Sequence, residues 1–474
     1  MYSLCLDCGA TNVRAMVVDD SGKIVGKASQ PNGTLPGAEN PEFHVWDADR
    51  IFRQLSDCAA AALQGLDVTQ VKAVTVTTFG VDGAPVDASG NLLYPVISWK
   101  CPRTGAVMKN IDRYISQDEL NRISGVGAFA FNTIYKLVWL KENRLEALEK
   151  AHAWLFISDI FAFKLTGVMA TDRTMAGTTQ LTDLATGDFS PEILGRIGIR
   201  RELFPRIVNA GEAIGTVTPD AAAKMGLSAL AGVPVISAGH DTQFAIFGSG
   251  AAKDQPVLSS GTWEILMARS AQAQLSPEDY ADGATAEFDA EPGLLNPGLQ
   301  WIGSGIIEWV KSTCFRGETY DTMDAEADVV APGCDGVSMV PDFLASGDSR
   351  GSVNGLVLGR TRGHIYRAAM EALTWRLKSR LRRLESVGGF KSKELILVGG
   401  GARNKIWTQM RADILRLPVK VSNVSESTVL GASMFAFAGA GVFSSPEQAR
   451  DAFGISYKTC LPGPQESVYE KFNR

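Results

Sequence analysis

The sequence predicts an α/β protein built from two related domains. At 474 residues the chain exceeds the roughly 250–300 residues at which a single hydrophobic core stops growing. A strand–turn–strand pattern with a polar, glycine-containing turn stands near the start of each half, at residues 2–18 and 257–267. Several other β-prone runs end in glycine and lead into helical spacing, as in open α/β sheets. We therefore expect domains at residues 1–250 and 251–474, separated by the linker-like stretch 250–255.

The composition is that of an ordinary soluble globular protein. The chain is 45% hydrophobic and 21% charged, with a net charge of −6. It has no polybasic stretch, so we expect neither nucleic acid nor an anionic membrane as a partner. The N-terminus lacks the pattern of a signal peptide. The apolar stretch 429–443 is shorter than the ~18–20 residues of a membrane span, and we expect it to form a buried helix.

The seven cysteines do not form a metal or disulfide pattern. Cys5 and Cys8 make a lone C-x-x-C, but no second pair or nearby histidine completes a zinc set. They also lie on a predicted strand and its turn, whereas a redox pair starts a helix. We expect free, buried thiols in a reducing cytoplasm.

The first polar turn is the feature around which we interpret the chain. It lies in Asp7-Cys-Gly-Ala-Thr-Asn-Val-Arg14, between β-prone residues 2–6 and 13–18, which predicts a hairpin. A carboxylate, a glycine that lets backbone approach a ligand, and small hydroxyl and amide groups suit a phosphate beside a divalent cation. A surface hairpin whose turn faces water is the alternative.

A candidate sugar site follows the predicted strand 71–78. This strand leads into Gly80-Val81-Asp82, and Asp82 is placed to accept hydrogen bonds from a polyhydroxylated substrate. Trp99, beside Lys100 and Arg103, offers an aromatic face for C–H surface and cations for oxygens. A turn aspartate and an ordinary surface cluster are the respective alternatives.

A candidate general base stands after the next predicted strand, residues 233–237. We expect Gly239 to end this strand and Asp241 to form the N-cap of a helix that starts at Thr242. A carboxylate at that position can take a proton from a substrate hydroxyl, while a purely capping role is the alternative. His240 either contacts the substrate or is a packed histidine.

The second half repeats the hairpin logic and adds a glycine-rich turn. Residues 257–267 enter and leave a Ser-Gly-Thr turn at Gly261 and Thr262. A predicted long helix, 362–384, is followed by a strand at 394–398 and then by Gly399-Gly400-Gly401-Ala402-Arg403-Asn404. Asn404 stands where a dinucleotide fingerprint needs its third glycine, which disfavours an NAD-dependent oxidoreductase. Glycines packed against a nucleobase or ribose explain the turn, and a tight turn without a ligand is the alternative.

With these stretches placed, the chain resembles the FGGY carbohydrate kinases of the actin/hexokinase/Hsp70 ATPase superfamily. The resemblance rests on residues 7–14, 76–83, 97–104, 123–129, 135–143, 236–244, 258–266 and 397–401. It implies two ribonuclease-H-like domains of the actin/hexokinase type, with ATP and sugar in the cleft between them. It further implies transfer of the ATP γ-phosphate to the terminal hydroxyl of a ketose. The expected ketose is L-fuculose, with L-rhamnulose or D-ribulose as alternatives and a non-catalytic sugar sensor as the rival of a different class.

The resemblance also implies roles for individual residues. Asp241 matches the catalytic base, and Asp7 matches the ligand of Mg²⁺ or another divalent cation. The implied nucleotide contacts are Gly9, Thr11, Asn12, Gly261, Thr262, Gly400, Gly401 and Asn404. The implied sugar contacts are Asp82, Trp99, His240 and Asp241. Asn12 departs from the family pattern, in which many sugar kinases carry Ser or Thr. The sequence leaves open whether the chain forms a homo-oligomer.

Overall fold

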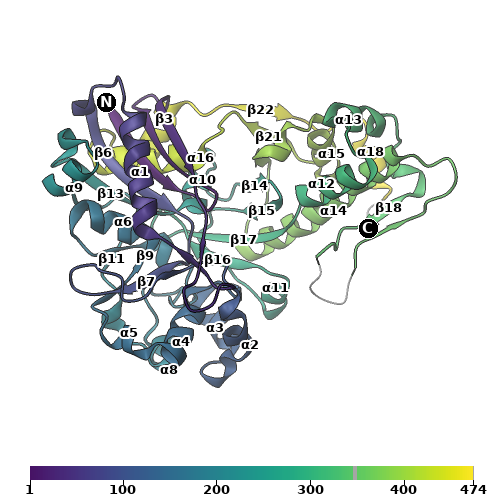
Figure 1. Ribbon diagram of the computed structural model, residues 1–474. Helices are drawn as coiled ribbons and strands as arrows, with labels where there is room; N and C mark the ends of the chain where they lie inside the picture. Colours follow the sequence, from purple (N-terminus) through teal and green to yellow (C-terminus); the bar gives the residue numbers. More distant parts are fainter. Residues whose placement is uncertain (345–349, 473–474) are drawn as a thin grey trace. The chain divides into compact units, whose positions relative to one another are not determined.

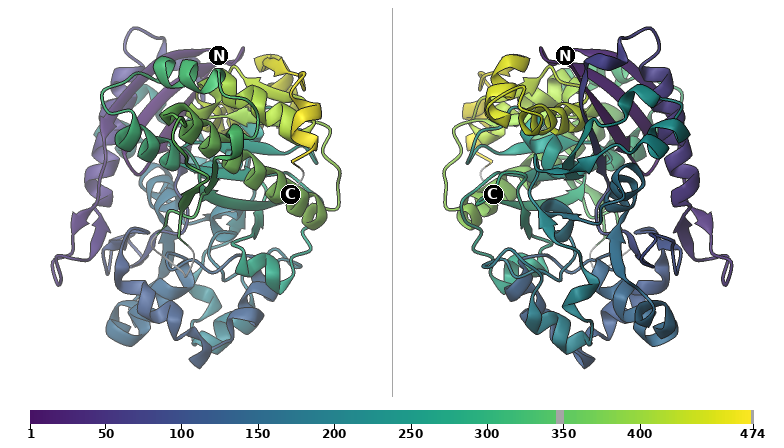
Figure 2. Two further views of the ribbon diagram at one scale, coloured as in Figure 1. Left: turned by 90° about the vertical axis from the view of Figure 1, so that its right-hand side faces the viewer. Right: turned by 90° about the vertical axis from the view of Figure 1, so that its left-hand side faces the viewer.

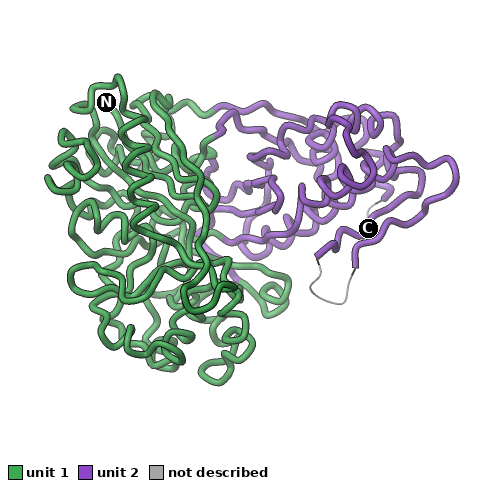
Figure 3. The backbone as a smooth tube through the Cα atoms, viewed as in Figure 1, with its two compact units in different colours: residues 1–250, 275–296, 426–455 green, residues 251–274, 297–425, 456–474 purple. Residues whose placement is uncertain are grey.

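The structure, a computed structural model, describes residues 1–344 and 350–472 of the chain. The chain divides into two compact units, which Figure 3 distinguishes by colour. Unit 1 consists of residues 1–250, 275–296 and 426–455, and unit 2 of residues 251–274, 297–425 and 456–474. The first break falls in the stretch that the sequence marks as a linker. The two later returns to unit 1 have no counterpart in the contiguous domains expected from sequence.

Unit 1 is built on a sheet whose strands run in the order β12-β13-β6-β1-β2-β3 (Figure 1). The bounds are β1 (Tyr2–Cys8), β2 (Asn12–Asp19), β3 (Ile24–Pro31), β6 (Val71–Thr78), β12 (Ala213–Thr216) and β13 (Pro234–His240). β1 and β2 form the expected antiparallel hairpin, and β1, β6 and β13 are mutually parallel. Cys8 pairs with Thr78, and Thr78 pairs with His240. The carboxyl ends of β1, β6 and β13 therefore lie at the same edge of the sheet.

Helices cover both faces of this sheet. On one face, α1 (Ala48–Ala62) and α6 (Ile157–Thr166) share a core with Val74. On the other face, α16 (Ser427–Gly439) packs on β6, β13 and α10 (Asp241–Gly248). Ala73 of β6 belongs to the hydrophobic cluster on this second face. The alternation of neighbouring strand residues between the two faces is that of a buried β-strand. The side views in Figure 2 show α1 lying along the N-terminal strands.

The buried helix predicted within residues 429–443 is confirmed as α16, which buries every residue from Val429 to Phe437. Cys5 and Cys8 are free and buried, as expected. Across residues 1–344 and 350–472, no helix is both long enough and apolar enough to cross a membrane.

The apolar spacing of residues 151–165 predicts a helix from sequence, and this prediction is partly wrong, because the segment opens with strand β9 (Ala153–Phe156) before α6 begins. β9 pairs antiparallel with β7 (Gly83–Val86), and all four of its residues are buried. A short apolar run buried on both faces shows no strand alternation, so periodicity alone does not separate it from the start of a helix.

Unit 1 contains further helices and strands outside this six-stranded sheet. They are β4 (Leu35–Pro36), β5 (His44–Trp46), β8 (Val96–Ile97), α2 (Gly105–Lys109), α3 (Gln117–Ser124), α4 (Thr133–Asn143), α5 (Leu145–Glu149), β10 (Thr171–Asp172), α7 (Arg173–Ala176), α8 (Pro191–Ile197), β11 (Ile207–Val208), α9 (Pro219–Lys224), α11 (Pro277–Ala281), β16 (Thr285–Phe288) and α17 (Pro446–Phe453).

Unit 2 repeats the central motif of unit 1. Its strands belong to a seven-stranded sheet in the order β16-β17-β15-β14-β20-β21-β22, whose first strand, β16 (Thr285–Phe288), lies within residues 275–296. The hairpin of β14 and β15 lies next to the parallel strand β20, as the hairpin of β1 and β2 lies next to β6. The bounds are β14 (Val257–Ser260), β15 (Trp263–Met267), β17 (Leu295–Ile302), α12 (Ser304–Cys314), α13 (Tyr320–Asp328), β18 (Ser338–Val340), β19 (Ser352–Asn354), α14 (Arg362–Gly388), β20 (Leu395–Val398), α15 (Lys405–Leu415), β21 (Val419–Ser422), β22 (Tyr457–Cys460) and α18 (Glu466–Glu470).

Candidate active site

Asp241 lies at the edge of the unit 1 sheet where three parallel strands end. β13 continues through Gly239 to His240, and His240 is the N-cap of α10. Asp241 is therefore the first residue of the helix, so the expectation that it forms the N-cap is wrong by one residue. The strand extends further than predicted because Gly239 fits against Asp172 and Thr174, where a larger residue would collide. At a helix N-terminus the carboxylate of Asp241 faces the positive end of the helix dipole.

Asp7 and Asp241 act on one another within unit 1. Asp7 is 2% exposed at the end of β1 and forms an ion pair with Arg14. Burial raises the pKa of Asp7 to about 6, with Arg14 opposing the rise and the charge of Asp241 adding to it. Arg14 also contacts Glu426 at 2.8 Å. The structure thus places the two carboxyl groups, more than two hundred residues apart in sequence, at one edge.

The first polar turn presents Thr11 and Asn12 to solvent. The Gly9 amide donates to the Asn12 carbonyl at 2.9 Å, and both Thr11 and Asn12 are exposed. A Cβ at Gly9 would lie 2.9 Å from the Asn12 carbonyl oxygen, so the turn requires glycine there. The turn therefore offers a hydroxyl, an amide and backbone N–H groups beside Asp7.

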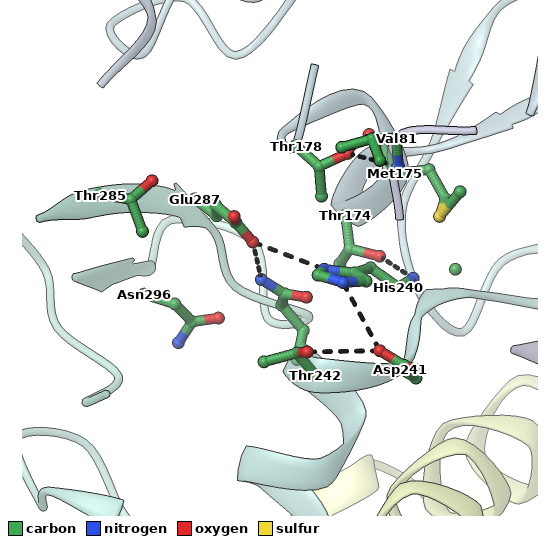
Figure 4. A network of polar contacts seen from close by, with 12 residues as sticks. Val81, Thr174, Met175, Thr178, His240, Asp241, Thr242, Thr285, Glu287 and Asn296 are labelled. Atoms are coloured by element: carbon green, nitrogen blue, oxygen red, sulfur yellow. Dashed lines mark hydrogen bonds and ion pairs between the residues drawn. The ribbon is translucent and has the colours of Figure 1, made fainter. Parts of the chain in front are cut away.

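A network of polar contacts surrounds His240 (Figure 4). Its Nε2 lies 3.5 Å from Asp241 Oδ1, and its Nδ1 lies 3.4 Å from Glu287 Oε2. Gln243 Nε2 donates to the same Glu287 oxygen at 2.7 Å, and the His240 amide donates to Thr174 Oγ1 at 2.8 Å. Burial lowers the pKa of His240, but Glu287 and Asp241 outweigh it, and the net shift is upward. The imidazole is thus held between two carboxylates.

Asp82 is fully buried, and its carboxylate is already occupied by protein donors. Trp46 Nε1 donates to it at 2.6 Å, the Trp99 amide donates to it at 2.9 Å, and Lys136 forms an ion pair with it. Burial raises the pKa of Asp82, and the charge of Lys136 opposes that rise. In this arrangement Asp82 fixes the backbone at Trp99, which differs from the direct contact with hydroxyls expected from sequence.

Trp99 is 36% exposed and belongs to a small aromatic surface. Its ring meets Phe131 edge to face at 6.4 Å, and Phe131 stacks on Phe129 at 5.1 Å. Lys100 Nζ lies 5.3 Å from the centre of the Trp99 ring. Arg103, which the sequence placed in the same cluster, is instead buried and stacked against other aromatic rings. Of the predicted cluster, the aromatic face of Trp99 and the Lys100 side chain remain accessible to a ligand.

In unit 2 the second polar turn lies on the start of α12. The amides of Gly303 and Ser304 donate to the carbonyls of Thr262 and Gly261, each at 2.9 Å. Thr262 is exposed. Beneath the turn, Arg411 and Glu264 form a buried ion pair. The turn is therefore fixed from below while its hydroxyl faces solvent.

The glycine-rich loop packs directly against this second turn. Gly399 has φ +90°, and a Cβ there would lie 2.6 Å from the Ser260 carbonyl oxygen. A Cβ at Gly401 would collide with the Ser260 side chain, whereas Gly400 faces open space. Unit 2 thus brings together the residues expected to contact phosphate and adenosine, and the close backbone approach explains the glycines.

Asn404 supports this loop with both ends of its side chain. Its Oδ1 caps α15 by accepting from the Trp407 amide at 2.8 Å. Its Nδ2 donates to Asp324 Oδ1 and to the Tyr366 hydroxyl, each at 2.9 Å. The side-chain amide of Asn404, which was expected to contact the nucleotide, is therefore already bonded within the protein. The open part of the loop is formed by Gly400 and Gly401.

Sequence reasoning missed Glu287 and Asp172. Asp172 accepts from Ser237 Oγ at 2.6 Å and holds Thr174, which in turn accepts from the His240 amide. The Thr-Asp-Arg-Thr stretch around Asp172 is a capping signal that sequence analysis can detect. Glu287 has no such signal, because nothing local shows that its segment returns to unit 1.

Comparisons with known proteins show which family the chain belongs to. Residues 2–248 match the N-terminal domain of the FGGY family of carbohydrate kinases, and residues 257–440 match its C-terminal domain. An L-fuculokinase of Escherichia coli (strain K12) is 52% identical, over 99% of this chain and 98% of that protein. A rhamnulokinase of Bacteroides thetaiotaomicron is 30% identical, over 81% of this chain and 80% of that protein.

A solved structure supports the fold. The xylulose kinase of Lactobacillus acidophilus superposes with a TM-score of 0.89 at 22% identity, covering 99% of this chain and 96% of that one. The predicted two-domain α/β fold of the actin/hexokinase type is confirmed. The chain belongs to the FGGY family of carbohydrate kinases.

Proposed function

We propose that this protein transfers the γ-phosphate of ATP to the terminal hydroxyl of L-fuculose, giving L-fuculose 1-phosphate and ADP. The observation that carries the proposal is the 52% identity to an L-fuculokinase along the whole chain. The position of Asp241 beside Asp7 supplies the chemistry that such a reaction needs. Because the reaction consumes ATP, we place it in the cytoplasm.

Asp241 is the general base in this proposal. Burial raises its pKa, and the nearby charge of His240 opposes the rise. A carboxylate in this position accepts the proton of the sugar hydroxyl while the hydroxyl oxygen attacks the γ-phosphorus of ATP. The bond between that phosphorus and the ADP oxygen breaks at the same time. His240 and Trp99 lie on the sugar side, where they orient the ketose.

Asp7 is the residue that we propose to hold a divalent cation such as Mg²⁺. Burial, with smaller contributions from the charges of Asp241 and Glu426, raises the pKa of this carboxyl against the opposing effect of Arg14, and a bound cation would favour its ionised form. In the described residues no set of three or more His, Cys, Asp or Glu side chains is arranged to hold a metal. This suits Mg²⁺, which keeps several waters and relies on one or two carboxylates plus substrate phosphates. When bound, the cation neutralises phosphate charge.

The two polar turns and the glycine loop are proposed to bind ATP. In unit 1 the proposed phosphate contacts are Thr11 and Asn12, with Gly9 allowing close backbone approach, and in unit 2 they are Gly261 and Thr262. Gly400 and Gly401 accommodate the adenosine. The exposure of Thr11, Asn12 and Thr262 supports these roles, since exposed hydroxyl and amide groups are free to bind phosphate oxygens.

The test is release of ADP from MgATP in the presence of L-fuculose, L-rhamnulose and D-ribulose. We expect the highest kcat/KM with L-fuculose, and equal or faster turnover of L-rhamnulose would reject this assignment. Related pockets discriminate between similar sugars by as little as ~1–3 kcal/mol, so the full panel is needed.

The variant Asp241→Asn separates a kinase from a sugar sensor. An amide cannot accept the hydroxyl proton, so we expect kcat to fall by about 10²–10⁴-fold while the sugar still binds. Calorimetric titration with L-fuculose provides the binding control. Retention of wild-type kcat in the variant would contradict the role of Asp241.

A further inference from the structure

Glu287 approaches the proposed sugar site from outside the elements that carry the family motifs. It lies on β16, within residues 275–296, which return to unit 1 after the chain has entered unit 2. Figure 4 shows its side chain reaching toward His240. The side chain is 14% exposed, so the carboxylate is largely withdrawn from water but still accessible.

One oxygen of this carboxylate is anchored to α10. Gln243, which is fully buried two residues beyond Asp241, donates to Oε2 at 2.7 Å, and His240 Nδ1 lies 3.4 Å from the same oxygen. The other oxygen, Oε1, has no protein partner anywhere in residues 1–344 or 350–472. Removing an ionised carboxylate from water is costly unless its acceptors are used, so an anchored carboxylate with a spare acceptor suits a ligand that donates to it.

The free carboxylate oxygen of Glu287 has a fixed position relative to Asp241, the proposed general base. His240 contacts Asp241 through Nε2 and Glu287 through Nδ1, so the two carboxylates are separated by one imidazole ring. A ketose whose terminal hydroxyl lies at Asp241 extends its secondary hydroxyls away from that point. Each secondary hydroxyl is a hydrogen-bond donor, and its direction depends on the configuration at its carbon.

We propose that Glu287 contacts the substrate, and that its free carboxylate oxygen accepts a hydrogen bond from a secondary hydroxyl of the ketose. This inference rests on the proposed function and adds a specificity-determining residue to it. L-fuculose and L-rhamnulose differ in configuration at C4, so a fixed acceptor favours one over the other. A site built to bond a hydroxyl discriminates strongly when that hydroxyl is missing or displaced.

The test measures kcat, KM for sugar and KM for ATP in Glu287→Ala and Glu287→Gln, with L-fuculose and L-rhamnulose. For L-fuculose we expect kcat/KM to fall by about tenfold to a hundredfold in both variants, mostly through KM for the sugar. KM for ATP stays at the wild-type value, and the preference for L-fuculose over L-rhamnulose narrows by about fivefold or more. The matched control is Glu278→Gln, an exposed carboxylate of the same segment, which we expect to leave all three constants unchanged.

The glutamine variant decides the matter if the alanine variant does not fold. Its amide keeps the volume of the carboxylate but has a single acceptor oxygen, which cannot serve both Gln243 and a hydroxyl placed opposite. Unchanged kinetics in Glu287→Gln would overturn the contact. An equal loss on both sugars through kcat alone would also overturn it, since that result means Glu287 only supports His240.

These outcomes are distinct from failure of the proposed function. If the wild-type protein phosphorylates no ketose, the proposed function and this inference both fall. If the wild-type protein phosphorylates L-fuculose and the Glu287 variants match it, only this inference falls.

Discussion

The most constrained ionic contact near the proposed sugar site is the pair formed by Asp82 and Lys136. Both side chains are 0% exposed, and the carboxylate also accepts from Trp46 and from the Trp99 backbone. The strength of such a pair is easily overestimated, because removing two charges from water offsets most of their attraction. Loss of one partner is a different matter, since it leaves a buried charge without compensation.

We therefore expect Asp82→Asn to lower the free energy of unfolding by about 3–5 kcal/mol. The double variant Asp82→Asn/Lys136→Met should recover part of that loss, because it removes the stranded charge. Urea unfolding followed by circular dichroism measures both variants. Asp220→Asn, in an exposed pair with Lys224, is the control and should change stability by less than about 0.5 kcal/mol. A double variant less stable than the single one would contradict this account.

A second buried carboxyl, Asp159, makes stability depend on pH. Burial raises its pKa to about 8, although hydrogen bonds from Thr171 and the Phe156 backbone oppose the rise. Between the unfolded value near ~4 and about pH 8, the folded state holds a proton that the unfolded state lacks. Stability from this group is therefore fully present at low pH and falls as pH rises through that window.

We expect the free energy of unfolding of the wild-type protein to fall between about pH 5.5 and pH 8, by up to ~1.4 kcal/mol per pH unit from this carboxyl. Asp159→Asn cannot ionise and should show a flatter dependence. Urea unfolding of both proteins across this range measures the difference. Identical slopes in the two proteins would mean that Asp159 is ionised in the folded state.

The positions of Asp7 and Asp241 in the fold could be foreseen because their context is local. Asp7 lies near the end of β1, before a turn, and Asp241 begins α10 directly after β13, and both patterns are visible along the chain. The role of Asp82 was harder to foresee, because whether a carboxylate is free or occupied depends on Lys136 and Trp46, which arrive from other elements. Glu287 has no local signal, since its partners lie forty or more residues earlier in the chain.

At the scale of secondary-structure elements, the position of the proposed base depends on how α10 packs against α16. A Cβ at Gly431 would collide with the Phe244 carbonyl and lie 3.0 Å from the Gly248 amide, so the two backbones touch. Phe435 adds ring contacts to Phe244 and Phe247 at 5.4 and 4.8 Å. Because α10 begins at Asp241, its position is set in part by a helix near the C-terminus.

Gly431→Val should push these helices apart. We expect a loss of about 1–3 kcal/mol or more in unfolding free energy, together with a lower kcat as α10 shifts. Thermal unfolding and steady-state kinetics measure the two effects. Gly195→Ala is the matched control, since a Cβ there meets open space and should be neutral or slightly stabilising. Normal stability and kcat in Gly431→Val would show that the crossing is more adaptable than its geometry indicates.

Regular elements were predicted best where their pattern is long or strongly alternating. β6 has the predicted bounds, and the predicted helix 362–384 is confirmed as part of α14. Short buried strands such as β9 were not predicted, because burial on both faces removes the periodicity on which prediction depends.

At the scale of the whole molecule, the connectivity of the chain sets what folds together. Residues 426–455 complete unit 1, although more than 170 residues separate them from its first part. Without α16, a fragment of residues 1–250 exposes the apolar faces of β6 and α10. Long-range completion of this kind has no local sequence signature, which is why the expected boundary at residue 250 captured only the first of several crossings.

We expect residues 1–250, expressed alone, to be largely insoluble or to bind the dye ANS strongly. Joining residues 426–455 to that fragment through a flexible linker should increase the soluble fraction and reduce dye binding, because α16 again covers β6 and α10. Soluble yield and ANS fluorescence measure the outcome. A soluble, cooperatively unfolding fragment 1–250 would contradict the requirement for α16.

Residues 275–296 belong to unit 1 although they follow the first segment of unit 2, and this connectivity has a consequence for recombination between related genes. A crossover at residue 250 separates the first part of unit 1 from β16, although both belong to the same folded body. The resulting chimera takes Asp241 and Trp99 from one parent and Glu287 from the other. If the proposed sugar contacts hold, we expect the chimera to take its choice of sugar from both parents, and we expect that exchanging residues 275–296 as well restores the preference of a single parent.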